Sequence, residues 1–135
     1  MSTFKITEDA IKVDALYHDV LKDRHGAIVT FAGVVRDHSG DKNTLYLEYE
    51  AYAPMAVKKM AQIGVEVGDR WGVEDIAILH RIGRLEIGEI SVLIAVASAH
   101  RLEAIQACHY AIDRLKEVVP IWKKEVGEAG EYWVE

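Results

Sequence analysis

The segment from Ser98 to Glu125 constrains the fold more than any other part of the chain. It follows Ile90–Ala97, a run apolar enough to be a central strand of a sheet. Apolar residues then recur at three- and four-residue spacing over residues 100–119, which predicts a long helix. Pro120 is expected to end this helix, and residues 121–126 to continue as an extended strand. The remaining elements must therefore pack around a strand, a long helix and a second strand in succession.

This segment also concentrates positive charge in a chain whose net charge is −6. The basic residues at its two ends are His100 and Arg101 at the start and Lys116, Lys123 and Lys124 towards the close. We expect the buried stripe of the helix to consist of Ile105, Cys108, Ile112, Leu115 and Val119. Lys116 lies about 60° from the middle of this stripe, at the border between core and solvent. A lysine near a helix C-terminus also favours the helix dipole, so a purely structural role for Lys116 stays open.

Arg101 stands at the opposite end of the helix, where a cation opposes the dipole. The free backbone N–H groups there favour an anion beside it, either a ligand or a structural carboxylate. Arg101 and Lys116 are 15 residues apart, or roughly 22 Å along a straight helix. The two residues therefore belong to one small-molecule site only if a second copy of the chain supplies one of them. That arrangement predicts a two-fold dimer with two composite sites.

Lys116 and Lys123 are separated by the reversal at Pro120, so their side chains are able to converge. Two neighbouring ammonium groups repel each other, and partial burial adds to this effect, so the pKa of a lysine in such a pair falls. A lysine with a lowered pKa exchanges protons near neutral pH or attacks a carbonyl group.

The remaining sequence predicts an α+β domain with an antiparallel or mixed sheet and three main helices. A second helix is expected at residues 13–22, with Asp14 as a possible N-cap and Gly26 as the signal that ends the helix. A third is expected at residues 54–71, with Pro54 in its first turn. Residues 82–84 are expected to form a turn, and the polar residues 37–43 either a mobile loop or a plain hairpin connection. The other expected strands are Phe4–Ile6, Gly26–Arg36 with a bulge or close approach at Gly33, Leu45–Tyr52, Val73–Arg81, Leu85–Ile87 and Glu131–Glu135.

Composition excludes several classes of function. The acidic balance argues against nucleic-acid binding, and no apolar run approaches the roughly 20 residues of a membrane span. Residues 1–135 are expected to form one cytoplasmic domain, since the first residues have no secretory signal pattern. Cys108 is the single cysteine and is expected to be buried and unreactive, which excludes an internal disulfide and a CxxC site. The spacing of the histidines and glycines predicts no metal site and no nucleotide cofactor.

Taken in order, these residues resemble the large (catalytic) subunit family of molybdopterin synthase. Each motif is weak by itself, whereas the ordered set is specific and covers nearly all of the chain from Gly26 onward. The motifs are Phe31–Arg36, Leu47–Glu50 followed by Met55-Ala56, His80–Gly83 with Leu85 and Gly88-Glu89, Ser98–Arg101, Asp113–Lys116, Pro120–Glu125 and Trp133-Val134.

The resemblance implies an α/β hammerhead fold and a homodimer. It further implies a small ubiquitin-like sulfur-carrier subunit docked on each protomer, giving a heterotetramer. The implied reaction transfers sulfur from the thiocarboxylated C-terminal glycine of the carrier to cyclic pyranopterin monophosphate, which yields molybdopterin. The implied substrate-binding residues are Val34, Val35, Arg36, His100, Arg101, Lys116, Lys123, Lys124 and Glu125.

We hypothesise that Lys116 is the acid/base or covalent participant and Lys123 its electrostatic partner, the two catalytic residues. A different class of function is a non-catalytic dimeric domain that binds a small phosphorylated ligand. A third, weaker alternative is an adaptor whose cations dock an acidic C-terminal tail. Assay of the chain with a thiocarboxylated carrier and the pterin distinguishes these hypotheses.

Overall fold

The computed structural model describes residues 2–128 and 130–134, which form an α+β fold with two sheets and three helices. The predicted class is confirmed. In chain order the elements are β1 (Thr3–Thr7), α1 (Val13–Val20), β2 (Ala27–Val34), β3 (His38–Ser39), β4 (Lys42–Ala51), α2 (Ala53–Trp71), β5 (Asp75–Arg81), β6 (Gly83–Glu86), β7 (Ile90–Ser98), α3 (Arg101–Val118), β8 (Ile121–Gly127) and β9 (Gly130–Val134). Glu135, the last residue of the predicted final strand, lies outside the described residues.

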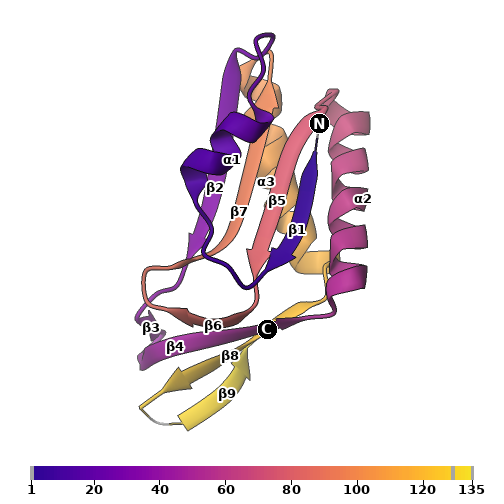
Figure 1. Ribbon diagram of the computed structural model, residues 1–135. Coiled ribbons are helices and arrows are strands. Elements are labelled where there is room, and N and C mark those ends of the chain that lie inside the picture. Colours follow the sequence, from indigo (N-terminus) through magenta and orange to yellow (C-terminus); the bar gives the residue numbers. More distant parts are fainter. Residues whose placement is uncertain (1, 129, 135) are drawn as a thin grey trace.

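The larger sheet has the strand order β1-β5-β7-β2. Strand β1 runs parallel to β5 and the other pairs are antiparallel, so this sheet is mixed. The second sheet has the order β3-β4-β8-β9, with β6 also paired to β4, and it lies across one end of the first sheet (Figure 1). The register of β2 against β7 shifts between Gly33 and Val34, which confirms the predicted bulge. At Gly33 an added Cβ would come within 2.7 Å of Val92 Cγ1, so only glycine fits there.

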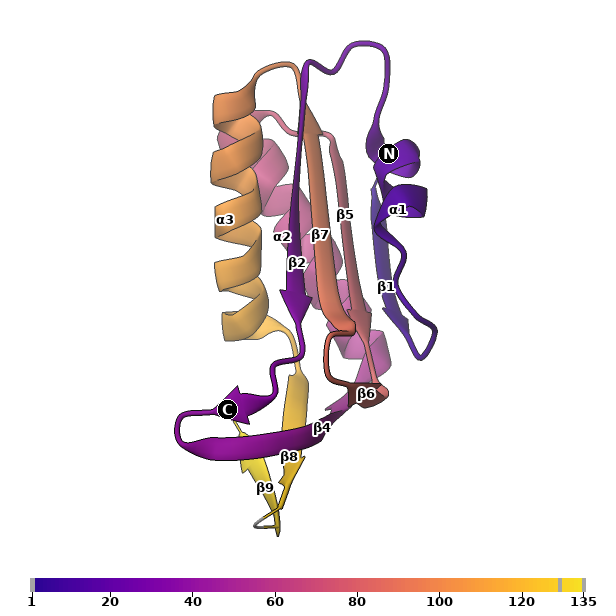
Figure 2. The same cartoon turned by 90° about the vertical axis from the view of Figure 1, so that its left-hand side faces the viewer.

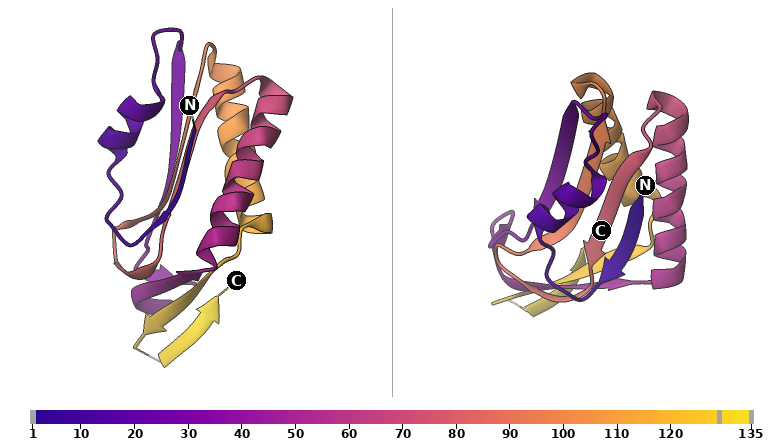
Figure 3. Two further views of the ribbon diagram at one scale, coloured as in Figure 1. Left: turned by 45° about the vertical axis from the view of Figure 1, so that its right-hand side comes forward. Right: turned by 45° about the horizontal axis from the view of Figure 1, so that its top comes forward.

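Helices α2 and α3 cover one face of the larger sheet and α1 covers the other (Figure 2). The left view of Figure 3 shows the strands between these two layers. Alternation along β5 explains the layers, since Ile76 and Ile78 pack towards α2 and α3, whereas Ala77 faces α1. Within the described residues, none of the helices is long and apolar enough to cross a lipid bilayer.

The predicted buried stripe of α3 is wrong at Ile105, of which 52% is exposed. The residues of α3 that the structure buries are Ala104, Ala107, Cys108, Ala111 and Leu115. Three of the five are alanines, so α3 lies close to the sheet and the larger side chains point away from it. The side-chain volume that the packing accepts, rather than hydrophobicity alone, sets the rotation of the helix.

Three local predictions at the ends of elements are wrong, and one alternative is decided. Lys12 occupies the N-cap of α1, so Asp14 belongs to its first turn. Gly26 does not end α1, because its N–H donates to Ser98 O at 3.0 Å and the backbone of Ala99 leaves no room for a Cβ. Residues 83–86 form β6 instead of continuing the predicted turn. Residues 38–43 form a tight hairpin, the second of the two alternatives, with Gly40 at φ 64°.

A buried carboxylate joins the segment after α1 to the start of β5. Asp75 is completely buried, and its carboxylate accepts hydrogen bonds from Lys22 Nζ and from Arg24 at 2.9 Å. His25 Nδ1 accepts a hydrogen bond from the N–H of Lys22 at 2.9 Å, so His25 Nε2 carries the hydrogen towards Asp75 at 2.9 Å. Burial raises the pKa of Asp75, but the hydrogen bond from Lys22 and the surrounding positive charge outweigh it and lower the pKa to about 2. This ion cluster holds α1 against the sheet.

Asp75→Asn is expected to lower the free energy of unfolding by about 3 kcal/mol, because it removes the buried negative charge that Lys22, Arg24 and His25 bond to. Glu74→Gln is the matched control, since the neighbouring carboxylate is exposed and pairs only with Arg24 among the described residues. The control should change stability by less than about 0.5 kcal/mol. Urea unfolding at pH 7 measures both values, and equal midpoints for the two variants would refute the proposed role of Asp75.

Candidate functional site

A cavity of about 520 Å³ opens where α3 ends beside the junction of the two sheets. Three of its lining residues are cations, namely Arg36, Lys116 and Lys123. The other lining residues are Phe31, Gly33, Tyr49, His80, Ser91, Val92, Ile112, Leu115, Val119, Ile121, Trp122 and Val134. Positive groups on an otherwise neutral wall suit a ligand that combines an anionic group with a flat apolar body.

The reversal after α3 brings the two lysines to the same cavity. Val119 is extended, with φ −86° and ψ 125°, and its N–H donates to Leu115 O at 3.1 Å. Pro120 then receives a hydrogen bond on its carbonyl from Tyr52 N–H at 3.2 Å, which directs β8 along β4. Lys123 pairs with Tyr49 in this register, and Lys116 lies in the last turn of α3. The predicted convergence of the two lysines is confirmed.

Burial lowers the pKa of Lys123, and repulsion from Lys116 and Arg36 lowers it further. The carboxylate of Glu125 acts in the opposite direction and raises the pKa of Lys123. Glu125 is itself buried and accepts a hydrogen bond from Thr44 Oγ1 at 2.7 Å. One fixed negative charge therefore faces three positive charges, and the site retains an excess of positive charge for an anion.

Lys124 lies on the other side of β8 from Lys123, because successive side chains alternate across a strand. Its Nζ contacts Glu48 at 3.1 Å and Glu131 at 3.5 Å, and the hydrogen bond to Glu48 raises its pKa. Its charge is thus already paired. The structure does not bring Lys124 to the cavity wall, so its predicted contact with a ligand stays a prediction.

Val34 and Val35 adjoin the cavity in sequence, between Gly33 and Arg36, but neither is among the described residues that line it. The Val35 side chain is buried, and its N–H and carbonyl are hydrogen-bonded to Glu89 and Gly88 at 3.0 and 2.9 Å. These two bonds fix the backbone from which Arg36 projects. The predicted contact of this backbone with a ligand stays a prediction.

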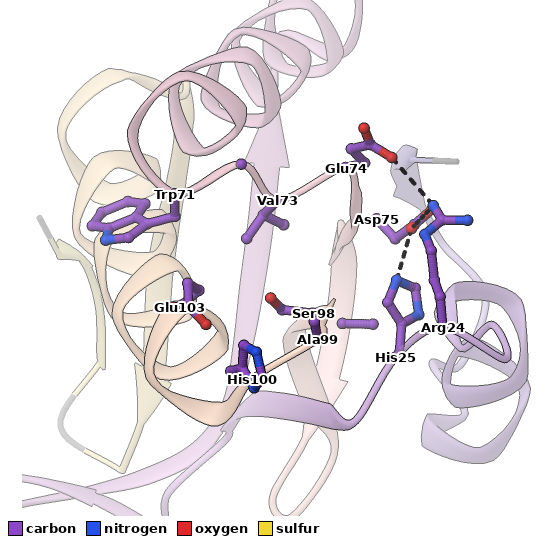
Figure 4. A pocket seen from close by; sticks show the side chains of 12 residues that line it. Arg24, His25, Trp71, Val73, Glu74, Asp75, Ser98, Ala99, His100 and Glu103 are labelled. Atoms are coloured by element: carbon purple, nitrogen blue, oxygen red, sulfur yellow. Dashed lines mark hydrogen bonds and ion pairs between the residues drawn. The ribbon is translucent and has the colours of Figure 1, made fainter.

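His100 and Arg101 lie at the far end of α3, away from the lysines (Figure 1). His100 lines a second cavity, of about 310 Å³, together with Glu103, Trp71 and His25 (Figure 4). Within this cavity Glu103 Oε2 is buried without a hydrogen-bond partner among the described residues. Arg101 is exposed beside it. One protomer therefore separates the two groups of predicted site residues, as the length of the helix requires.

His80, Tyr49 and Ser91 line the first cavity and were missed as site residues on the sequence. His80 belongs to the family motif His80–Gly83 but is not among the predicted site residues, and its place at the end of an apolar strand is the signal that could identify it. Tyr49 alternates inward on β4, opposite Lys123. Cys108, in contrast, is buried on α3, and burial raises its pKa to about 11, as expected for an unreactive thiol.

The fold and the cavity together define an α+β protein with a cationic pocket for a small anionic ligand. The family model described as "MoaE protein" matches residues 6–118. The molybdopterin synthase catalytic subunit of Bacillus subtilis is 51% identical over 134 residues, which are 99% of this chain and 85% of that protein. The chain belongs to the MoaE family, and the predicted family and enzyme class are confirmed.

Solved structures support the same assignment. The crystal structure of molybdopterin synthase from Staphylococcus aureus superposes with a TM-score of 0.95 at 47% identity, covering 100% of this chain and 98% of that one. The predicted hammerhead fold is thereby confirmed. A structure from Helicobacter pylori, named as a complex of subunits 1 and 2 of molybdopterin-converting factor, has a TM-score of 0.80 at 22% identity and covers 97% of this chain and 89% of that one. This last likeness concerns the fold alone.

Lys116→Ala is expected to raise the pKa of Lys123, because it removes one of the two cations that repel it. The pH dependence of the acylation rate of Lys123, followed by peptide mass spectrometry, measures this change. Lys124→Ala is the control, since its charge is paired with Glu48 and Glu131 on the other side of the strand. The same pKa for Lys123 in both variants would contradict the assigned repulsion.

His80 predicts a pH dependence of stability. Burial lowers its pKa to about 4 in the fold, against about 6.5 in an unfolded chain. The unfolded state therefore binds the extra proton between these values, and stability is lost as the pH falls from about 6.5 to about 4. The contribution amounts to roughly 3 kcal/mol. Urea unfolding at several pH values measures how steeply the free energy of unfolding falls between these limits. The fall should be smaller in His80→Leu and unchanged in His109→Leu, at an exposed histidine. An equal fall in both variants would contradict the prediction.

Proposed function

We propose that the chain is the catalytic subunit of a molybdopterin synthase and transfers sulfur from a thiocarboxylated carrier protein to cyclic pyranopterin monophosphate. The observation that carries the proposal is the cavity with Arg36, Lys116 and Lys123 in a chain of the MoaE family. The phosphate of the substrate and the thiocarboxylate of the carrier are both anions. With three cations and one buried carboxylate, the cavity has enough positive charge to bind both anions at once.

The sulfur must arrive on another molecule, because Cys108 is the single cysteine and is buried. In each transfer a carbon–sulfur bond forms at the pterin side chain while a carbon–oxygen bond at the same carbon breaks, and the oxygen leaves on the phosphate or as water. Water then cleaves the bond between that sulfur and the acyl carbon of the carrier, which leaves as a carboxylate. Two carriers supply the two sulfurs of one product. No external oxidant or reductant enters this balance.

The lysines provide the proton transfers that these steps need. Lys116 stands at the rim of the cavity and acts as the acid/base or covalent residue. Lys123 is half-buried beside Lys116, and its positive charge holds the anionic groups in place. Arg36, fixed by the bonded backbone of Val35, binds the phosphate.

A two-fold dimer would complete the site. His100 and Arg101 of one protomer would reach the cavity lined by Arg36, Lys116 and Lys123 of the other, which we call the lysine cavity. The separation of the two groups along α3 supports this arrangement. One ubiquitin-like carrier on each protomer would make a heterotetramer, and the Helicobacter pylori structure of the same fold is by name a complex of two subunits. The proposal includes binding of Val34, Val35, Lys124 and Glu125 to the carrier tail or substrate, and a cytoplasmic location, which cell fractionation tests.

Lys116→Ala is expected to reduce the conversion of cyclic pyranopterin monophosphate at least 100-fold, because it removes the proton-transfer group. Mass spectrometry of the product formed with a thiocarboxylated carrier measures the rate. Lys58→Ala, at an exposed lysine of α2, is the matched control and should keep the rate. Near-normal conversion by the Lys116 variant would overturn the role of Lys116.

Mixing two inactive variants tests the composite site in the same assay. Lys116→Ala and Arg101→Ala protomers, unfolded and refolded together, should regain activity, because a mixed dimer contains one intact site. An inactive mixture would contradict sharing across the dimer. Binding of pterin by the wild-type protein without any turnover would favour the non-catalytic alternative.

A further inference from the structure

His80 lies at the floor of the lysine cavity and has a fixed hydrogen-bonding pattern. Only 4% of the residue is exposed to solvent. Nδ1 lies 2.7 Å from the carbonyl oxygen of Arg81. A carbonyl only accepts, so Nδ1 carries the hydrogen and, in the neutral ring, Nε2 is an acceptor.

The surroundings of His80 hold the ring in this state. Arg81, whose carbonyl binds Nδ1, is itself fixed by hydrogen bonds to Glu89 at 3.0 Å and to Glu8 O at 3.1 Å. The ring of Tyr49 meets the imidazole edge-on, with 4.9 Å between the ring centres. Burial and, to a smaller extent, the positive charge of Lys123 lower the pKa of His80 to about 4 against the hydrogen bond to the Arg81 carbonyl, which raises it, so the ring stays neutral at neutral pH.

The cavity therefore combines three side chains that only donate with one fixed acceptor. Arg36, Lys116 and Lys123 provide donors for an anion. Nε2 of His80, in contrast, accepts no hydrogen bond from the residues that the structure describes. A purely anionic ligand satisfies the cations and offers this acceptor no donor, whereas a ligand that also carries an N–H group satisfies both.

We infer that His80 is a substrate-orienting residue whose Nε2 accepts a hydrogen bond from a ring N–H of the pterin, while the three cations hold its phosphate end. The identity of the substrate rests on the proposed function; the presence of three donor side chains and one fixed acceptor in the same cavity does not. The pyrimidine ring of a pterin carries both amide and amino N–H groups. An apolar wall of Val92, Ile112 and Leu115 accompanies the flat ring.

This orientation distinguishes one end of the substrate from the other. A reversed pterin would place its phosphate against the lone pair of His80 and its N–H groups against the cations, and both contacts are unfavourable. His80 thus selects the position of the carbons that receive sulfur without taking part in proton transfer. Its role is positioning through the substrate it binds, and its loss should weaken binding more than it affects the anion site.

The test compares two ligands in the absence of carrier, the pterin substrate and inorganic phosphate. In His80→Leu the Kd for the pterin should rise about tenfold, while the Kd for inorganic phosphate stays unchanged. His80→Gln, whose amide oxygen is an acceptor, should recover part of the affinity for the pterin. His109→Leu, at an exposed histidine on α3, is the matched control and should bind both ligands as the wild type does.

A second measurement needs no variant and covers a failure of His80→Leu to fold. In the ¹⁵N-labelled wild-type protein, the Nε2 resonance of His80 should move upfield when the pterin is added and stay in place with inorganic phosphate. An unchanged pterin Kd in His80→Leu, or an unmoved Nε2 resonance in the pterin complex, would overturn the inference. Failure of the wild-type protein to bind the pterin would instead refute the proposed function.

Discussion

The close packing of α3 on the larger sheet is the contact on which the rest of the structure depends. Ala104, Ala107 and Ala111 are completely buried between the helix and the sheet, and their small side chains let the two backbones approach. With this helix axis fixed, its 18 residues extend roughly 27 Å from one end of the domain to the other. The end of α3 then lies beside the junction of the two sheets, where Pro120 turns the chain into β8. Both cavities, and the distance between them, follow from this one packing contact.

The lysine cavity is electrostatically unfavourable when it is empty, because Arg36, Lys116 and Lys123 repel one another near a half-buried surface. The buried pair of Glu125 and Thr44 offsets part of the repulsion without removing it. Binding an anion relieves what remains, so part of the free energy of binding comes from the strain of the free protein. The contrast with Asp75 is instructive, since that carboxylate is paired with two cations, Lys22 and Arg24, and is already satisfied in the fold. The two clusters share similar residue types, but among the described residues only the first has more cations than carboxylates.

Much of this arrangement could be predicted from the sequence. Periodicity located the helices, Pro120 predicted the reversal that joins Lys116 to Lys123, and helix geometry separated Arg101 from both. Local sequence signals gave wrong predictions where tertiary contacts determine which residue fits. Gly26, for example, is a glycine because the backbone of Ala99 leaves no room for a side chain, and not because a helix ends there. The rotation of α3 was wrong at Ile105 because packing volume, which no periodicity records, prevailed over hydrophobicity. His80 was missed for a related reason: its function depends on the carbonyl it binds and the cations around it, and these come together only in three dimensions.

The burial of Cys108 has a consequence for the way such a protein responds to its chemical environment. With a pKa of about 11, roughly one thiol in ten thousand is ionised at pH 7. Glutathione disulfide, peroxides and persulfides all react with the thiolate, so they find almost no reactive form of Cys108. Sulfur that passes through the cavity therefore moves between bound molecules and is not diverted to a protein atom. Oxidising conditions should therefore leave this thiol unmodified, which follows from its place on the inner face of a helix.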